Sequence, residues 1–245
     1  MKRFFSSIRS ALVPLSGVIV VAILLSACSK FDDDDNGTDT PVSGLMAFNL
    51  VPDKEAIGVA IGNNLLTNAP LQYTNFTGTY QRIFPGNREV EAFDARTDSS
   101  IAKASQNFEA NKYYSVFTVG VNGTYSNVIT HDNFDSLNSS SGKAYVRYIN
   151  AIPDSTQPTV TIAANGSNVF NTAASFTSVS DFAAVDPGQV SVTVKNSSTI
   201  DANRSIELQQ GKVYTVLLIG IPGNADSNKA VQIKFVENGS LSAGQ

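Results

Sequence analysis

The sequence predicts an all-β protein that contains two tandem antiparallel β-sandwich domains. Four stretches of sequence recur in the same order, with their copies 100 to 102 residues apart. Each copy is rich in short segments of alternating apolar and polar residues, and turn residues interrupt these segments about every eight to twelve positions. No amphipathic helix of adequate length lies between the segments, which favours an antiparallel sandwich over a parallel sheet.

The repeated stretches indicate that a complete small domain has been duplicated, because a period of this length is too long for a solenoid. We expect one domain at residues 44–133 and a second at 143–238. The polar segment FDSLNSSSG at 134–142 is then a linker that leaves the two domains independent. The matched stretches are FNLVPD (48–53) with INAIPD (149–154), VAIGNN (59–64) with VTIAAN (160–165), TYQRIFPGNREV (79–90) with DFAAVDPGQVSV (181–192), and NKYYSVFTVGV (111–121) with GKVYTVLLIGI (211–221).

The alternation within each copy is that of half-buried strands. In GQVSVTVKN (188–196), three valines point to one side, whereas serine, threonine and lysine point to the other. The segment KVYTVLLIG (212–220) is almost continuously apolar, which predicts a central strand covered on both faces. Pro-Gly pairs at 85–86 and 187–188 predict turns. We expect about seven strands in each copy, and a short helical turn near 99–105.

The first 27 residues have the pattern of a secretory signal. A basic head contains Lys2, Arg3 and Arg9, residues 11–27 carry no charge, and the small residues Ser26 and Ala27 close the apolar run. The alternative is a transmembrane anchor. The run of 17 residues is at the short limit for spanning a bilayer, and aspartates rather than a basic cluster follow it. We therefore favour the signal at 1–27.

Residues 28–43 predict a flexible acidic tether. The segment begins with Cys28, the only cysteine, and continues through four consecutive aspartates with almost no apolar content. A calcium loop would space its oxygen ligands and add a glycine turn and a glutamate, and this run has neither feature. One cysteine cannot form a disulfide within its own chain, so we expect the domains to be stable through packing alone.

The residues at this junction resemble known export signals. Leu25-Ser26-Ala27-Cys28 resembles the lipobox of bacterial lipoproteins, which implies diacylglycerol on the Cys28 thiol and cleavage between Ala27 and Cys28. Acidic residues directly after the lipidated cysteine are similar to the surface-export signals of Bacteroidetes lipoproteins. These resemblances imply an outer-membrane protein that is anchored through N-terminal acyl chains and faces the cell exterior. The acidic residues concerned are Asp32, Asp33, Asp34 and Asp35.

The second copy resembles the bacterial domain of unknown function 4397. The resemblance lies in AYVRYINAIPDSTQPTVTIAANG and VSDFAAVDPGQVSVTVKN, and the first copy shares it more weakly. It implies an immunoglobulin-like sandwich and an exported protein, but no activity, because the family has none assigned. The chain departs from the family at Asn150, where many members have histidine, and at Gly78, Thr79 and Tyr80, which replace Ser-Asp-Phe. The matching residues are Arg147, Pro153, Asp154, Gly166, Ser180, Asp181, Phe182, Pro187 and Gly188.

Residues that could support catalysis or bind a metal are scarce. His131 is the only histidine, and we expect it to be an exposed residue at the end of a strand, beside Asp132. There is no G-x-S-x-G elbow, phosphate-binding glycine motif or zinc-ligand cluster. Glu89 and Glu91 lie on the outward face of one strand, where they keep that face soluble. The sequence therefore predicts a protein that is not an enzyme and that has no cofactor and no metal site.

The repeated aspartates and several tyrosines also have structural interpretations. Asp53 and Asp154 could each grip a ligand, but we expect turns in which the carboxylate accepts hydrogen bonds from nearby backbone. The side chains of Tyr113, Tyr114 and Tyr214 are expected in the core or between sheets.

Charge limits the class of partner. Removal of residues 1–27 takes away three cations and no anion, so the formal net charge changes from −4 to −7. Nucleic acid is not an expected partner, because no basic face is available. Two hypotheses remain. The first is a structural or adhesive surface module that interacts with other proteins. The alternative is a ligand-binding lipoprotein, with a glycan as one candidate ligand, that serves an outer-membrane uptake system.

Overall fold

The computed structural model describes residues 40–154 and 156–241, which form two β-sandwiches in tandem. This confirms the predicted fold class. Repeat 1 contains β1 (Ser43–Leu50), β2 (Ala56–Ile61), β3 (Asn64–Leu65), β4 (Leu71–Gln72), β5 (Gln81–Ile83), β6 (Gly86–Asp94), β7 (Ser100–Phe108), β8 (Tyr113–Val121) and β9 (Thr124–His131). Repeat 2 contains β10 (Ala144–Asn150), β11 (Thr159–Ala164), β12 (Ser167–Ala173), β13 (Ala183–Val185), β14 (Gly188–Lys195), β15 (Asp201–Leu208), β16 (Lys212–Ile219) and β17 (Gln232–Ser240).

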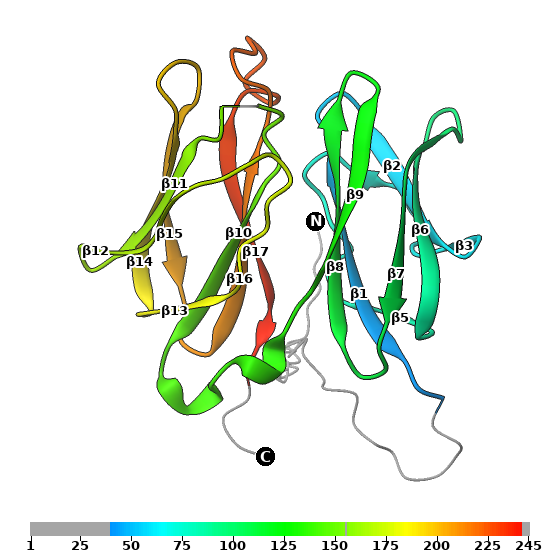
Figure 1. The fold of residues 1–245 in the computed structure, drawn as a ribbon, viewed down its shortest axis with the longest axis horizontal. Coiled ribbons are helices and arrows are strands. Elements are labelled where there is room, and N and C mark those ends of the chain that lie inside the picture. The colour runs from blue at the N-terminus through cyan, green and yellow to red at the C-terminus, as the bar shows by residue number, and fades with distance from the viewer. Residues whose placement is uncertain (1–39, 155, 242–245) are drawn as a thin grey trace, which may run out of the picture.

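Each repeat has an inner sheet, which faces the other repeat, and an outer sheet on the far side. The four sheets lie side by side as layers (Figure 1). The inner sheets have the orders β5-β1-β8-β9 and β13-β10-β16-β17. The outer sheets have the orders β3-β2-β6-β7, with β4 also beside β2, and β12-β11-β14-β15. The pairs β1–β8 and β10–β16 are parallel, whereas every other strand pair in the described residues is antiparallel.

The predicted alternation places the expected side chains inside each sandwich. In β14, Val190, Val192 and Val194 are buried between the sheets of repeat 2, whereas the residues between them face outward. Tyr114 and Tyr214 are buried at matching places, and each hydroxyl accepts a hydrogen bond from a backbone N–H five residues earlier in the chain. The two sandwiches therefore repeat both their topology and the details of their cores.

The expected independence of the two domains is wrong, because the inner sheets share a buried apolar cluster. Alternate residues of β8 and β16 point into their own sandwich, and the residues between them point toward the other repeat. This explains why KVYTVLLIG is apolar on both faces, as its sequence predicted. The fully buried members of the shared cluster are Met46, Phe48, Leu50, Phe117, Val119, Ile149, Ala151, Leu217 and Ile219. We call this cluster and the polar residues beside it the seam.

Two further expectations are corrected. Residues near 99–105 form part of β7 rather than a helical turn, because they pair along their length with β6. The 134–142 segment contains two short 3₁₀ turns, η1 (Phe134–Ser136) and η2 (Ser139–Ser141). The ring of Phe134 packs against Tyr80 and Phe182, at centroid distances of 5.8 and 5.9 Å. The linker is therefore folded against both repeats.

Two repeated features of the sequence have a structural cause. Asn49 and Asn150 are buried, and each side-chain amide donates to a backbone carbonyl of the segment that returns from the outer sheet, at 2.9 Å. Each side-chain oxygen also accepts from the backbone N–H two residues later. Gly120 and Gly220 have φ of 122° and 104°, and a Cβ at either would lie 2.1 Å from a backbone oxygen. The repeated motifs therefore encode a backbone clamp and a close approach between strands.

Candidate functional site

A buried arginine stands at the centre of the seam. Arg147 extends from β10 of repeat 2, and only 2% of its side chain is exposed. Its Nη1 donates to Asp132 Oδ1 at 2.6 Å, and its Nη2 donates to Ser115 Oγ at 3.0 Å. Both partners belong to repeat 1. The Nε donates to Thr215 Oγ1, on the neighbouring strand of repeat 2, at 3.0 Å. This one side chain therefore ties the two repeats together.

The carboxylate that receives Arg147 is fully buried and has several donors. Asp132 follows directly after β9, and its Oδ2 accepts from the hydroxyls of Tyr80 and Ser115 at 2.5 and 2.6 Å. The pKa of Tyr80 lies well above its ordinary value. Burial is the larger cause and the negative charge of Asp132 is the second, because both favour the neutral phenol. One oxygen of the Asp132 carboxylate is therefore paired with the guanidinium of Arg147, and the other accepts from two hydroxyls inside the protein.

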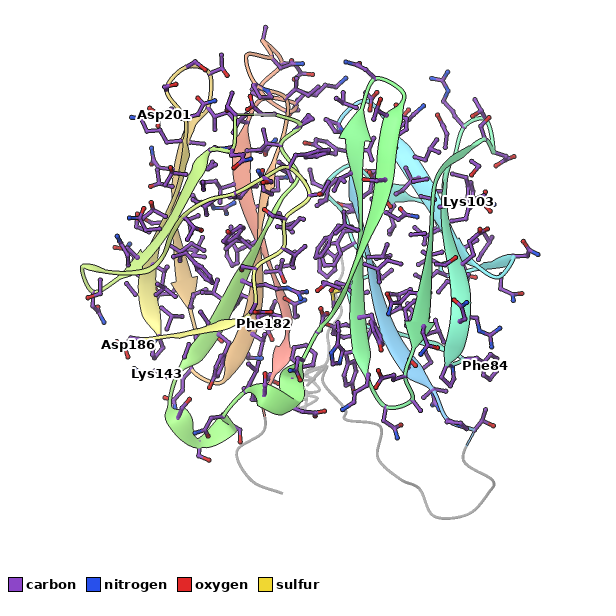
Figure 2. All side chains as sticks on the ribbon, in the orientation of Figure 1. Phe84, Lys103, Lys143, Phe182, Asp186 and Asp201 are labelled. Atoms are coloured by element: carbon purple, nitrogen blue, oxygen red, sulfur yellow. The ribbon has the colours of Figure 1, made fainter. Side chains whose placement is uncertain are left out.

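Aromatic rings enclose the ion pair. The Arg147 guanidinium lies 4.4 Å from the ring centroid of Phe182, on its own repeat, and 5.8 Å from that of Phe117, on the other. Figure 2 shows Phe182 at the side of repeat 2 that faces repeat 1. Guanidinium groups are attracted to such ring faces, most strongly where water is excluded. The rings therefore add to the interactions that hold Arg147 in one orientation.

The counterpart of this ion pair on the other side of the seam is uncharged. Met46 pairs in register with Ser115 as Arg147 pairs with Thr215, so methionine occupies the arginine position in repeat 1. In repeat 2, Thr215 Oγ1 donates to Asn238 Oδ1 at 2.6 Å, as Ser115 donates to Asp132. The Asn238 amide lies 4.0 Å from the Met46 sulfur. The seam therefore contains one charged pair and one neutral pair at related positions.

A shallow polar pocket of about 280 Å³ opens beside the ion pair. The serine of the Ser-Asp-Phe motif has a structural role there, because Ser180 Oγ accepts from the backbone N–H of Tyr148 and donates to the carbonyl of Asp181. His131 is exposed, as expected, and its ring lies 5.2 Å from that of Tyr114. The pocket offers hydroxyl, amide, carboxylate and imidazole groups to solvent. Its lining consists of Thr130, His131, Asn133, Ser136, Arg147, Ser180, Asp181 and Phe182.

The two repeated aspartates behave differently. Asp154 accepts from the backbone N–H of Thr156 at 2.5 Å, which confirms the expected local turn. The same expectation is wrong for Asp53, which accepts from the backbone N–H of Asn122 and the hydroxyl of Tyr125 at 2.8 and 2.7 Å. Asp53 therefore fastens its loop to the distant β8–β9 turn.

The remaining candidate residues lie on the outer sheet of repeat 1 or outside the described residues. Glu89 and Glu91 both lie near Lys103, at 2.9 and 3.5 Å, on the outer sheet of repeat 1. Ala27, Cys28 and the acidic run Asp32 to Asp35 lie outside the described residues. In residues 40–154 and 156–241 there is no group of three or more potential metal-ligating side chains. The same residues include no helix that is long and apolar enough to cross a membrane.

The Arg147–Asp132 pair could not be recognised as a unit from the sequence. In the sequence, Arg147 stands out only as a match to a family pattern, and Asp132 only as the neighbour of His131. One signal could have identified Arg147, because it is the sole charged residue in the strand AYVRYIN. A charge in a strand that is otherwise buried requires a partner. The position of Asp132 beyond the end of β9 gave no comparable signal.

Comparison with protein families connects this architecture to known sequences. The family described as "Domain of unknown function (DUF4397)" matches the chain twice, at residues 43–157 and 144–244. The chain belongs to this family. The first DUF4397 match extends through the linker into repeat 2, and the second covers all of repeat 2.

Other comparisons add little to the DUF4397 assignment. No curated protein matches the chain. Among solved structures, the chain is similar to a "putative cell adhesion protein" from Bacteroides eggerthii, with 10% identity and a TM-score of 0.24. The alignment covers 84% of this chain and 98% of that one. At this identity and TM-score, the likeness supports no conclusion about fold or function.

Proposed function

We propose that the protein is a lipid-anchored module of the cell surface that acts in structure or adhesion, by binding other proteins, and that it catalyses no reaction. The observation that carries the proposal is the shared seam, which joins the two sandwiches into one body and leaves both outer sheets open. Such a body suits a spacer or an adhesive unit, because each face can bind a partner without disturbing the core.

The outer faces have the polar character that this proposal requires. In β14 the outward residues include Gln189, Ser191 and Lys195, which alternate with the buried valines. On the opposite side of the molecule, Lys103 lies between the carboxylates of β6. Figure 2 shows Lys103 and Asp201 at opposite outer sides. Polar and charged residues of this kind keep the outward face of a sheet solvated, as a module that stands exposed at a cell surface requires.

The proposed anchor rests on the sequence. Cleavage before Cys28 would make this residue the new N-terminus, and two or more acyl chains would hold it stably in a membrane. The acidic tether would extend by charge repulsion and reach on the order of 20 Å, which is enough to lift the sandwiches above the lipid head groups.

Intact cells provide the test. The Cys28→Ala variant should be released from membranes or remain unprocessed, whereas the wild-type protein should be membrane-bound and open to external protease. Replacing Asp32 to Asp35 with alanine should leave the protein membrane-bound but hidden from external protease. Full surface exposure of that variant would show that the aspartates are only a spacer. Membrane retention and normal processing of the Cys28→Ala protein would contradict the anchor.

A second candidate function has one observation in its favour. The polar pocket beside the seam combines hydrogen-bonding groups with the aromatic ring of Phe182, as a weak carbohydrate site does. On this alternative the protein binds a glycan and assists an outer-membrane uptake system. A glycan array tests this alternative when it is probed with the soluble body, by which we mean the two sandwiches produced without the signal and the lipid anchor. Saturable binding that Asp181→Ala abolishes, without a change in thermal stability, would favour the alternative over the structural module.

A further inference from the structure

The seam has an approximate twofold relation between the repeats. Each repeat contributes the same two adjacent strands of its inner sheet, and the register of Met46 with Ser115 matches that of Arg147 with Thr215. Contacts across the seam follow the same relation. The side chain at the arginine position of one repeat contacts the aspartate or asparagine position of the other. An interface of this kind resembles an isologous dimer interface built within a single chain.

The apolar part of the seam is similar on the two sides. Phe48 corresponds to Ile149, Phe117 to Leu217 and Val119 to Ile219, and all six side chains are fully buried. Large apolar residues therefore face large apolar residues whichever repeats are paired. The apolar cluster favours docking of inner sheets in general, but it does not determine which repeat docks with which.

The polar part of the seam does distinguish the pairings. When repeat 2 docks on repeat 1, Arg147 meets Asp132, and Met46 meets the neutral Asn238. If two copies of repeat 1 docked in the same way, each Asp132 would face a methionine and would be buried without a cation. If two copies of repeat 2 docked, each Arg147 would face an asparagine and would be buried without an anion. A buried charge that lacks its partner is strongly unfavourable.

We propose that the Arg147–Asp132 pair selects the partner of each inner sheet, so that repeat 2 docks on repeat 1 and not on a repeat 2 from a second copy of the chain. A single buried polar group sets register and partner in coiled coils by the same principle. The selection matters for a protein that is tethered beside many identical copies, because the similar apolar surfaces would otherwise cross-pair between neighbours.

Exchanging the residues at two positions tests the proposal in the full soluble chain without changing its composition. The variant Met46→Arg with Arg147→Met moves the arginine to repeat 1. Docking within the chain would then bury an arginine against Asn238 and a methionine against Asp132. Docking of repeat 1 on the repeat 1 of a second chain would instead satisfy both arginines. We expect the apparent mass of this variant, measured by light scattering, to at least double as its concentration increases, under conditions in which the wild-type mass is constant.

A second exchange should reverse the effect. Adding Asp132→Asn and Asn238→Asp to the first two substitutions restores one charged and one neutral pair within the chain. The charged pair then lies between positions 46 and 238, and the neutral pair lies between positions 147 and 132. This fourfold variant should fold and keep the constant mass of the wild type, even if the first variant fails to fold. The proposal is overturned if the twofold variant folds and keeps the wild-type mass, or if the fourfold variant associates or fails to fold.

Discussion

Removal of the buried cation is the sharpest perturbation of stability that the structure suggests. In Arg147→Met, a shorter and uncharged side chain replaces the arginine, and the Asp132 carboxylate keeps only the hydroxyl donors of Tyr80 and Ser115. Loss of one partner of a buried ion pair costs about 3–5 kcal/mol, because the remaining charge is buried without compensation. Domains are stable by roughly 5–15 kcal/mol, so the variant should lose a large share of its stability.

The second part of this prediction concerns the double variant. Arg147→Met combined with Asp132→Asn removes both charges and recreates the methionine and asparagine that occupy the counterpart positions. Because uncharged replacements of a buried ion pair are often neutral in stability, the double variant should recover most of the loss. The coupling between the two sites should therefore be several kcal/mol, which exceeds the about 0.5–3 kcal/mol commonly measured between residues in contact.

Urea unfolding, monitored by circular dichroism, measures these differences. Lys103→Met is the matched control, because it also removes a cation from carboxylates, at 2.9 and 3.5 Å, but half of the Lys103 side chain is exposed. The control should unfold at the wild-type midpoint, since exposed ion pairs contribute little. The reasoning is refuted if Arg147→Met is as stable as the control, or if the double variant is no more stable than Arg147→Met.

Three further predictions follow from individual residues. Burial and the charge of Asp132 raise the pKa of Tyr80, so the folded state holds this proton more tightly than the unfolded state. The contribution of Tyr80 to the free energy of unfolding should therefore be constant below the ordinary tyrosine pKa of about 10 and should fall as the pH rises above it. Urea midpoints from pH 8 to 11 would show a smaller fall in Tyr80→Phe, and an equal fall would exclude Tyr80 as a cause. Gly220→Ala should destabilise the protein by about 1–3 kcal/mol more than Gly223→Ala, because its Cβ would lie 2.1 Å from Ala230 O whereas Gly223 has open space; equal melting temperatures would contradict this. Chelator and reductant should leave the melting temperature unchanged, and a shift of several degrees on chelation would reveal a metal site.

Local features of the fold could be predicted from the sequence, because they depend on neighbouring residues. The valines of β14 alternate with polar residues, and a strand with one wet face is the result. The duplication could be read directly as repeated motifs. The apolar run of β16 correctly predicted burial on both faces, but a strand pattern does not identify what covers the second face. Each sandwich covers one face of its own inner sheet, so the second covering had to come from another surface.

The site was harder to predict because its residues are distant in the sequence. Arg147 and Asp132 meet across the linker, and Ser115 and Thr215 reach them from strands that pair in parallel with β1 and β10. Parallel pairing of this kind joins segments that are separated by most of a domain, and alternation of side chains does not encode it. The pairing of Asp53 with Tyr125 was missed for the same reason, whereas the local turn at Asp154 was predictable.

Calorimetry of the soluble body tests most directly whether the seam makes the two repeats one structural unit. We predict one unfolding transition whose calorimetric enthalpy equals its van't Hoff enthalpy, because the shared cluster requires both sandwiches to unfold together. In Arg147→Met, this single transition should move to a lower temperature or divide into two. Two transitions in the wild-type protein, each with about half of the total enthalpy and neither shifted by Arg147→Met, would contradict the account.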